Sequence, residues 1–355
     1  MKQRNFPIFD GHNDTLVNLH LPERGKGRSF FVRSEVGHID LPRAREAGYS
    51  GGVFAVYVPA CSPASILNSD VKKSDSGILP RPDGSLDVGY ARDFTIAVVA
   101  RLLRLEAESG GQVKIVRNVD EILDCFDKEI LAVVLHFEGA EAIDSDLNML
   151  EVFYQVGLRS LGITWSRPNV FGWGVESGFP SSPDTGAGLT DSGRRLVRRC
   201  NQLGIMLDVS HLNEKGFWEV AGLSEAPLVA SHSAAHALCA SARNLTDRQL
   251  DAIAESDGIV GVNFYPGFLR ADGRSEPDTC PDEIIRHMDY IVQRIGIEHV
   301  GLGTDFDGAE IPLEIKDVTG LPKIISALEK IGYDESSLAE IAYKNWVRVL
   351  RKTWQ

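Results

Sequence analysis

Residues 131–139 read LAVVLHFEG, and this stretch decides the fold. Its apolar residues run on without alternation, which is typical of a parallel strand that is buried on both faces. Seven other short runs share this character: 8–10, 52–58, 158–165, 204–209, 227–231, 258–264 and 299–303. Apolar residues at helical spacing lie between several of these runs, at 90–108, 191–203, 246–255 and 282–295. Because eight strands that alternate with helices close a (β/α)8 barrel, the sequence predicts a TIM-type α/β barrel.

Composition limits the possible functions. The chain has 355 residues and a net charge of −13, from 37 Lys+Arg and 50 Asp+Glu, and 43% of its residues are hydrophobic. These values are typical of a soluble globular protein, and a barrel of this length can form a single domain over residues 1–355. The acidic balance argues against nucleic acid as a partner. No apolar run of 18 residues predicts a membrane span, and no apolar segment precedes Asp10, so we expect a cytoplasmic protein without a membrane partner.

Several local features refine this prediction. The five cysteines form no C-x-x-C pair, so we expect free thiols in a reducing compartment. Asn213 and Thr246 each precede a helical run and are predicted N-caps. Residues 59–89 and 166–190 are rich in Pro and Gly and each follows a strand, so we expect two long loops at the carboxyl end of the barrel that shape a binding site. Residues 320–354 predict two further helices, which would cover the outside.

Histidines and carboxylates follow five of the predicted strands. In a barrel the carboxyl ends of the strands meet at one mouth, so these side chains would share a small volume. His12 and Asp14 are two residues apart, and residues i and i+2 of an extended chain project to the same side. Each group alone has an ordinary structural explanation, but buried carboxylates that lie together without cations are costly. The set therefore predicts a site for divalent cations.

The number of candidate ligands predicts two ions. A single catalytic Zn²⁺ takes three protein ligands, whereas six groups suit two ions that share a carboxylate; the six are His12, Asp14, Glu138, His211, His232 and Asp305. Imidazole and carboxylate favour Zn²⁺, with Mn²⁺, Fe²⁺ and Co²⁺ as alternatives. Glu138 is the expected bridge, because the fourth strand ends in Thr164-Trp165-Ser166 and offers no lysine. His136 is expected behind the ligands. Asp305 is preferred to Asp307 because it is nearer the strand.

Taken together, these motifs resemble the membrane (renal) dipeptidase family, metallopeptidases of the amidohydrolase-like barrels. The matching pieces, in order, are DGHND at 10–14, EG at 138–139, SH at 210–211, SHS at 231–233, RN at 243–244 and GTDFDG at 303–308. The resemblance implies a binuclear zinc site with two Zn²⁺ per chain. In it, His12, Asp14 and Asp305 would hold one ion, His211 and His232 the other, and Glu138 would bridge. The absence of H-E-x-x-H excludes a zincin.

The resemblance also implies a substrate and the residues that bind it. Family members cleave dipeptides, often with a D-residue at the C-terminus. Arg243 matches the residue that grips the terminal carboxylate, which suits the planar fork of a guanidinium. Tyr265 matches a residue of the same pocket. Members of the renal type carry a histidine at the end of strand 4, where this chain has Trp165. An indole cannot exchange a proton, so either the metals alone stabilise the oxyanion, or Asn169 or another loop residue helps.

We therefore expect a zinc-dependent dipeptidase whose substrates include L-Xaa-D-Xaa dipeptides. A hydroxide between the ions would attack the peptide carbonyl, and Asp305 would carry its proton to the leaving amine. An N-acyl-amino-acid deacylase or a lactonase would use the same metals with a different carboxylate clamp. A barrel that binds a metal or ligand without turnover is the alternative from another class. Members of the family commonly form dimers, so the resemblance also implies a possible homodimer.

Overall fold

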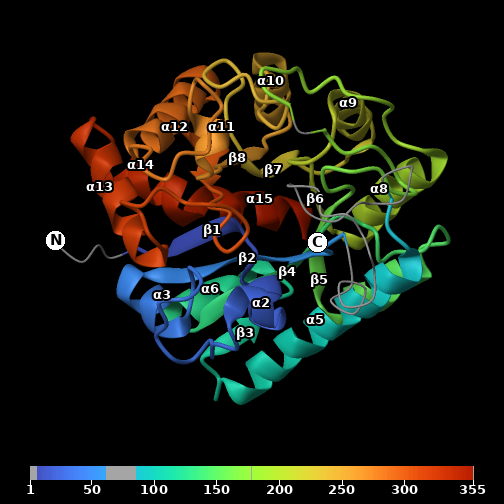
Figure 1. The fold of residues 1–355 in the computed structure, drawn as a ribbon, viewed down its shortest axis with the longest axis horizontal. Helices are drawn as coiled ribbons and strands as arrows, with labels where there is room; N and C mark the ends of the chain where they lie inside the picture. The colour runs from blue at the N-terminus through green and yellow to red at the C-terminus, as the bar shows by residue number, and fades with distance from the viewer. Residues whose placement is uncertain (1–5, 61–84, 177, 355) are drawn as a thin grey trace, which may run out of the picture.

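The computed structural model describes residues 6–60, 85–176 and 178–354. Its centre is a closed barrel of eight parallel strands: β1 (Ile8–Asn13), β2 (Tyr49–Tyr57), β4 (Leu131–Glu138), β5 (Leu158–Gly162), β6 (Met206–Asp208), β7 (Val229–Ser233), β8 (Ile259–Val262) and β9 (Val300–Leu302). The strands pair in the order β2-β1-β9-β8-β7-β6-β5-β4, and β4 pairs with β2 to close the ring. Helices surround it (Figure 1). The predicted α/β barrel is confirmed.

The structure contains one strand that the sequence pattern did not predict. The three-residue β3 (Val113–Ile115) pairs with the beginning of β4, at Leu131 to Val133. Farther along, from Leu135, β4 pairs with β5 instead. β3 therefore widens the sheet at its amino-terminal end without becoming part of the closed ring. Several ring strands are also shorter than their apolar runs: β5 ends at Gly162 and β8 at Val262.

The predicted helices are present. They are α5 (Val88–Glu108), α8 (Asp191–Leu203), α10 (Asp247–Glu255) and α12 (Asp282–Ile295). The other helices of the described barrel wall are α1 (Thr15–His20), α2 (Pro22–Gly25), α3 (Leu41–Ala47), α6 (Val119–Asp127), α7 (Asn148–Val156), α9 (Glu214–Leu223) and α11 (Pro266–Leu269). Both predicted N-caps are confirmed: Asn213 accepts a hydrogen bond from the Gly216 amide, and Thr246 forms a capping box with Gln249. Among the described residues, no helix is both long and apolar enough to cross a membrane.

The C-terminal helices do more than cover the outside of the barrel. They comprise α13 (Leu321–Lys330), α14 (Glu335–Ala339), a π-helical segment η3 (Glu340–Lys344) and α15 (Asn345–Thr353). Trp346 is fully buried, packs on Phe9 of β1, and donates its indole N–H to the carbonyl of Leu302 at 3.1 Å. Arg348 donates to the carbonyls of Gly258 and Glu298, which precede β8 and β9. The red α15 thus crosses the middle of Figure 1 and closes the amino-terminal end of the barrel.

The remaining predictions concern loops and cysteines. Most of the predicted loop at 59–89 lies outside the described residues. The loop at 166–190 is held against the segment that follows β6, where the Val175 amide donates to the carbonyl of His211 at 2.8 Å. Four cysteines of the described chain are free thiols, namely Cys125, Cys200, Cys239 and Cys280, and Cys61 lies outside it. With one end of the barrel closed by α15, the site must lie at the carboxyl ends of the strands.

Candidate metal centre and substrate cavity

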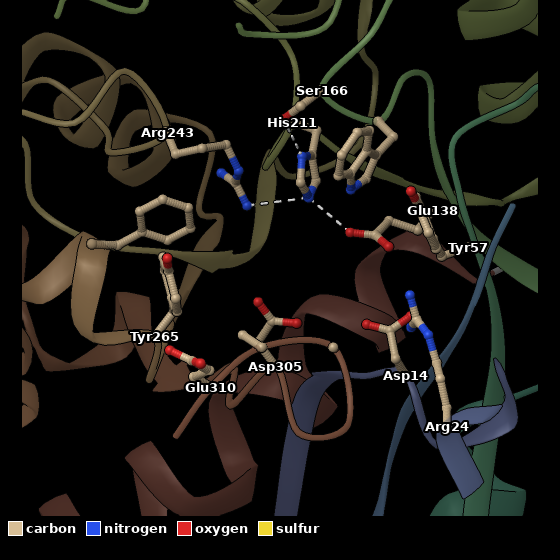
Figure 2. A pocket seen from close by; sticks show the side chains of 14 residues that line it. Asp14, Arg24, Tyr57, Glu138, Ser166, His211, Arg243, Tyr265, Asp305 and Glu310 are labelled. Carbon is tan, nitrogen blue, oxygen red and sulfur yellow. Dashed lines mark hydrogen bonds and ion pairs between the residues drawn. The ribbon is translucent and has the colours of Figure 1, made fainter. Parts of the chain in front are cut away.

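The six predicted ligands come from the carboxyl ends of five strands. His12 lies near the end of β1 and Asp14 directly follows that strand. Glu138 is the last residue of β4 and His232 belongs to β7, whereas His211 and Asp305 lie three residues beyond β6 and β9. Glu138, His211, Asp14 and Asp305 face one cavity in Figure 2. Glu138 and the three histidines are at most 9% exposed, so their charges are shielded from water.

The ligand atoms form two trios that meet at Glu138. Glu138 Oε1 lies 2.7 Å from His211 Nε2, 3.4 Å from His232 Nε2 and 3.7 Å from His12 Nε2. The Nε2 atoms of His211 and His232 are 2.9 Å apart. Glu138, His211 and His232 form one trio, and His12, Asp14 and Asp305 form the other, with the ligand atoms of each trio within 4.8 Å of one another. One carboxylate thus connects two candidate cation positions.

Hydroxyl groups behind the imidazoles fix their orientation. Ser231 Oγ donates to Asp208 Oδ2 at 2.5 Å and lies 2.8 Å from His232 Nδ1. Because this hydroxyl proton is committed to Asp208, we assign a proton to Nδ1 of His232, which leaves the Nε2 lone pair facing the cavity. Ser166 Oγ lies 2.9 Å from His211 Nδ1, and Arg243 Nη2, which can only donate, lies 3.3 Å from His211 Nε2, so we assign the lone pair of His211 to Nε2 as well. Two lone pairs that face each other repel unless a cation lies between them.

A third group of potential ligands combines His12 and His232 with Asp208. The carboxylate of Asp208 is already occupied: Oδ1 accepts from the amide and hydroxyl of Ser210 and from the amide of Ser231, and Oδ2 accepts from the Ser231 hydroxyl. It also does not line the cavity. Asp208 therefore supports the ligands from behind and is a poor candidate for a ligand itself.

The electrostatics of the cluster fit a divalent cation. Burial lowers the pKa of His211 and His232 well below the ordinary value, and Arg243 adds to this for His211, so both imidazoles are neutral. Burial, and then the Asp14 carboxylate, raise the pKa of Glu138 well above its usual range. Burial lowers the pKa of His12, but the carboxylates led by Glu138 outweigh it and raise the value to about 10. His12 is therefore protonated in the metal-free site. Its positive charge takes the place that the charge of a bound metal ion would fill.

Unpaired atoms in the cluster support the same conclusion. His12 Nε2 and Asp14 Oδ1 are buried and have no hydrogen-bond partner among the described residues. Asp14 occupies the N-cap position of α1, yet its side chain caps no amide. Buried polar atoms are almost always satisfied, so atoms left free here indicate a ligand. The residues present therefore fit a metal centre.

His136 and Asp307 are committed elsewhere. His136 Nδ1 lies 2.8 Å from Ser160 Oγ, and burial lowers the pKa of His136 to about 4, so it is a neutral residue of the barrel interior. The Asp307 carboxylate accepts hydrogen bonds from the Thr15 hydroxyl (2.9 Å), the His38 amide (2.7 Å) and the Arg28 guanidinium (3.2 Å). Asp307 thereby ties the loop after β9 to the segment after α2, and neither residue belongs to the two trios at Glu138.

A cavity of about 470 Å³ opens over the two trios. Its wall is formed by Asp14, Arg24, Tyr57, Glu138, Trp165, Ser166, His211, Arg243, Tyr265, Phe268, Asp305, Gly308, Ala309 and Glu310. Arg243 is only 5% exposed, donates to the carbonyls of Ser210 and His232, and stacks on Phe268. Burial lowers the pKa of Arg243 to about 10, so it remains charged at neutral pH. Its Nη2 lies 3.3 Å from His211 Nε2, at the edge of the cluster of candidate ligands.

Comparison with known proteins gives this site a family. A family model described as membrane dipeptidase (peptidase family M19) matches residues 2–355. The chain belongs to this family. A solved structure of the metallopeptidase "dipeptidase AC", also of family M19, is 46% identical, with 99% of both chains covered and a TM-score of 0.90. The predicted resemblance is therefore confirmed.

Two further relatives of this M19 dipeptidase are informative. A Rhodobacter sphaeroides metallopeptidase, solved with a phosphinate mimic of the dipeptide L-Ala-D-Ala, is 46% identical, with 99% of this chain and 100% of that chain covered and a TM-score of 0.90. A Klebsiella pneumoniae protein described only as lying in the pqqA 5' region is 48% identical over 257 residues, which are 72% of this chain and 95% of the relative. The M19 dipeptidase described here is a metal-dependent hydrolase of peptide bonds.

Trp165, the departure from the pattern that the resemblance implies, lines the cavity. In this M19 dipeptidase its ring stacks on His211, with centroids 5.7 Å apart, and packs against Tyr57 at 5.0 Å. The guanidinium of Arg167, held by Glu141 at 2.7 Å, lies over the rings of both Trp165 and Tyr57. Trp165 is thus a fixed aromatic wall of the cavity rather than a mobile proton donor.

The loop residue Asn169 does not line the cavity of this M19 dipeptidase. Its side-chain amide donates to the carbonyl of Ile163 at 2.8 Å, and its Oδ1 accepts from the amide of Phe171 at 2.8 Å. Both groups of the amide are therefore used to shape the loop at 166–190. The suggestion that Asn169 helps to stabilise an oxyanion finds no support in this geometry.

Sequence reasoning missed several residues of the site. Asn263 donates to Asp305 Oδ2 at 3.0 Å and accepts from the Tyr265 amide at 2.6 Å, so it positions both residues. The sequence feature that could have revealed Asn263 is its polar side chain near the end of the apolar run at 258–264. Ser166 orients His211, as described above, and its signal was its place directly after a predicted strand end. Arg24 and Glu310 reach the cavity from segments in which no motif pointed to chemistry.

Proposed function

We propose that this M19 dipeptidase holds two Zn²⁺ ions that share Glu138 and cleaves dipeptides, including those of L-Xaa-D-Xaa configuration. The observation that carries the proposal is the single oxygen Glu138 Oε1, which faces the Nε2 atoms of three histidines at 2.7, 3.4 and 3.7 Å, with one ligand trio on each side. A mixture of imidazole and carboxylate ligands suits Zn²⁺.

The ligand sets follow from the two trios. His12, Asp14 and Asp305 would hold one ion, His211 and His232 the other, and Glu138 both. When bound, the ions supply Lewis acidity and lower the pKa of a coordinated water toward neutrality. Glu138 and Asp14 are then no longer uncompensated charges, which removes the electrostatic penalty that raises the pKa of Glu138.

Arg243 accounts for the selection of dipeptides. Its charged guanidinium lines the cavity beside the ligand cluster, and its Nε has no hydrogen-bond partner among the described residues. The C-terminal carboxylate of a dipeptide would accept hydrogen bonds from this group. A longer peptide would bring a neutral amide to the same place, and the arginine would lose its counter-charge in a buried position. Tyr265 and Phe268 form the wall beside the same subsite.

Asp305 is suited to moving the proton. Its carboxylate lines the cavity beside His12 and Asp14, where it can take a proton from a water molecule and pass it on. Asn263 holds Oδ2 at 3.0 Å, so the carboxylate keeps one orientation. Asp305 would accept the proton that the attacking water loses and would return it to the nitrogen of the leaving amino acid. Trp165 cannot exchange a proton, so its contribution is to exclude water from one side of the cavity.

The stereochemical part of the proposal has its own support. The Rhodobacter sphaeroides relative, at 46% identity, was solved with a mimic of L-Ala-D-Ala. That compound has a D-residue at the C-terminal position, next to the terminal carboxylate. We therefore include L-Xaa-D-Xaa dipeptides among the substrates.

The test is a screen of L-Xaa-L-Xaa and L-Xaa-D-Xaa dipeptides with zinc-loaded protein, with chelator-stripped protein as the control. We expect hydrolysis only by the loaded protein, and little hydrolysis of tripeptides or of dipeptide amides. N-acyl amino acids and lactones belong to the same screen. Faster cleavage of either class than of any dipeptide would contradict the proposal and favour the alternative hydrolase.

Metal analysis tests the shared carboxylate separately. Elemental analysis of the loaded protein should give about two zinc ions per chain. Glu138→Gln should bind fewer, because an amide cannot bridge two cations. Glu310→Gln makes the same chemical change at another residue of the cavity wall, outside both trios, and should keep both ions. Equal zinc content in the two variants would show that Glu138 is not the bridge.

A further inference from the structure

A second arginine lines the cavity far from the carboxylate subsite. Arg24 belongs to the short helix α2 and contributes to the cavity wall together with Asp14 and Tyr57. Figure 2 shows its side chain on the side of Asp14 and Tyr57, with Arg243 across the cavity. Arg24 is close enough to Tyr57 to offset part of the rise that burial causes in the pKa of the Tyr57 hydroxyl. The two arginines thus approach the metal cluster from different sides.

No described residue compensates the charge of Arg24. Its guanidinium has no hydrogen bond or ion pair with any residue that the structure describes. Other arginines around the barrel mouth are paired: Arg28 with Asp307 at 3.2 Å, Arg43 with Asp40 at 2.7 Å and Arg167 with Glu141 at 2.7 Å. A free guanidinium at the wall of a substrate cavity is therefore available to a substrate anion.

The backbone that carries Arg24 is fixed even though its side chain is free. Leu21, which precedes α2, and Gly25, its last residue, are both buried. A Cβ atom added at Gly25 would lie 2.3 Å from the carbonyl oxygen of Asn18, so the last residue of the helix packs directly on α1. Pro22 at the start of the helix restricts the backbone further. Packing thus sets the direction from which Arg24 reaches the cavity.

The other charges of the cavity define which part of a substrate meets Arg24. Asp14, Glu138 and Asp305 are ligands in the proposed metal centre, and this leaves Arg24, Arg243 and Glu310 as the remaining charged residues of the wall. With the C-terminal carboxylate on Arg243, the N-terminal residue of a dipeptide would extend past the two ligand trios toward Tyr57 and Arg24. Glu310 lies near Tyr265 on the other side, where it would repel an acidic C-terminal side chain (Figure 2).

We infer that Arg24 selects dipeptides whose N-terminal residue carries a carboxylate, that is, glutamate or aspartate. The inference rests on the proposed dipeptidase function and names a substrate class within it. A charge-assisted hydrogen bond from a guanidinium discriminates a carboxylate from an isosteric amide. Because Arg24 is largely exposed, water weakens the interaction, and we expect about a fivefold preference in kcat/KM.

The test compares two substrates that differ only in this charge, L-Glu-Ala and L-Gln-Ala, with the alanine in whichever configuration is cleaved faster. The measured quantity is the ratio of their kcat/KM values. For the native protein we expect a ratio of about 5 that falls as ionic strength rises. Arg24→Gln should bring the ratio close to 1, and Arg24→Glu should make L-Lys-Ala a better substrate than L-Glu-Ala.

Lys26→Gln provides the matched control. Lys26 follows α2, is exposed, and does not line the cavity, so this variant makes the same change in net charge. It should keep the ratio of the native protein. A second pair, L-Ala-Glu and L-Ala-Gln, places the charge on the C-terminal residue and should show no preference for the acid.

Binding measurements supply a readout that does not depend on turnover. Phosphinate mimics of L-Glu-Ala and L-Gln-Ala, titrated by calorimetry, should differ about fivefold in Kd with the native protein and little with Arg24→Gln. The inference is overturned if both dipeptides are cleaved equally well, if Lys26→Gln loses the preference as Arg24→Gln does, or if the acid is preferred at the C-terminal residue. Cleavage of neither dipeptide by zinc-loaded protein would instead overturn the dipeptidase function, and the inference with it.

Discussion

Replacing Asp305 by asparagine should have opposite effects on the metal-free and the zinc-loaded protein. The substitution keeps the size of the side chain and leaves an oxygen to which Asn263 can still donate. It removes a partly buried negative charge, which should stabilise the metal-free fold. It also removes the proposed proton acceptor, which should lower turnover of the loaded protein by about 10²- to 10⁴-fold with zinc still bound.

The size of the stability effect follows from the pKa of Asp305. Burial raises this pKa from 3.8 to about 6, against the influence of His12. Between these values the folded state holds a proton that the unfolded state has released, so raising the pH destabilises the native fold. From pH 4 to pH 6.5 the loss amounts to about 2 kcal/mol, and solvent screening of the partly exposed side chain reduces it to about 1–2 kcal/mol. Asparagine does not titrate, so over this pH interval the unfolding free energy of the variant should rise by this amount relative to that of the native protein.

Urea unfolding of the chelator-treated proteins at pH 4 and pH 6.5 measures the effect. The difference in unfolding free energy between Asp305→Asn and the native protein should shift by about 1–2 kcal/mol in favour of the variant over this interval. Asp93→Asn, an exposed aspartate of α5 outside the cavity, is the control and should show no such shift. A difference that is the same at both pH values would refute the argument from burial. Unchanged turnover of the zinc-loaded variant would refute the role in proton transfer.

Three further substitutions test other parts of the structure. Arg243→Lys keeps the charge but loses the planar fork, so kcat/KM for dipeptides should fall about 10- to 100-fold, and a steady-state assay that shows no loss would contradict the carboxylate clamp. Ser166→Ala removes the hydroxyl at His211 Nδ1 and should weaken zinc binding about 10- to 100-fold in a competition with a chelator. Trp346→Ala should lower the unfolding free energy by about 3–5 kcal/mol in urea, because a fully buried ring is lost from the closed end of the barrel.

The barrel itself was predictable because its signal is local. Continuous apolar runs such as 131–135 are typical of strands that are buried on both faces, and eight of them in alternation with helices favour a closed barrel. β3 escaped notice because Val113–Ile115 is short and its middle residue, Lys114, interrupts the apolar pattern. It exists because the start of β4 offers a free edge, which is a property of the assembled sheet.

The C-terminal helices show how far apolar periodicity in a sequence can predict a structure. The pattern in 320–354 indicates helices that each bury one face, and four helical segments are found there. It does not indicate the surface against which that face packs. Only the three-dimensional structure shows that Trp346 fills the amino-terminal opening of the barrel and bonds to Leu302, 44 residues earlier in the chain.

The sequence alone determined which residues are candidate metal ligands. Ligands such as His12 and Glu138 stand at strand ends, and in a parallel barrel every strand end points to the same mouth. The tertiary structure decided how these groups meet, with Glu138 Oε1 between the histidines, Asp307 bound to Arg28 and Asn169 turned into its loop. It also brought Arg24 to the cavity. Such distances depend on how the closed ring and its loops pack, and no spacing along the chain encodes them.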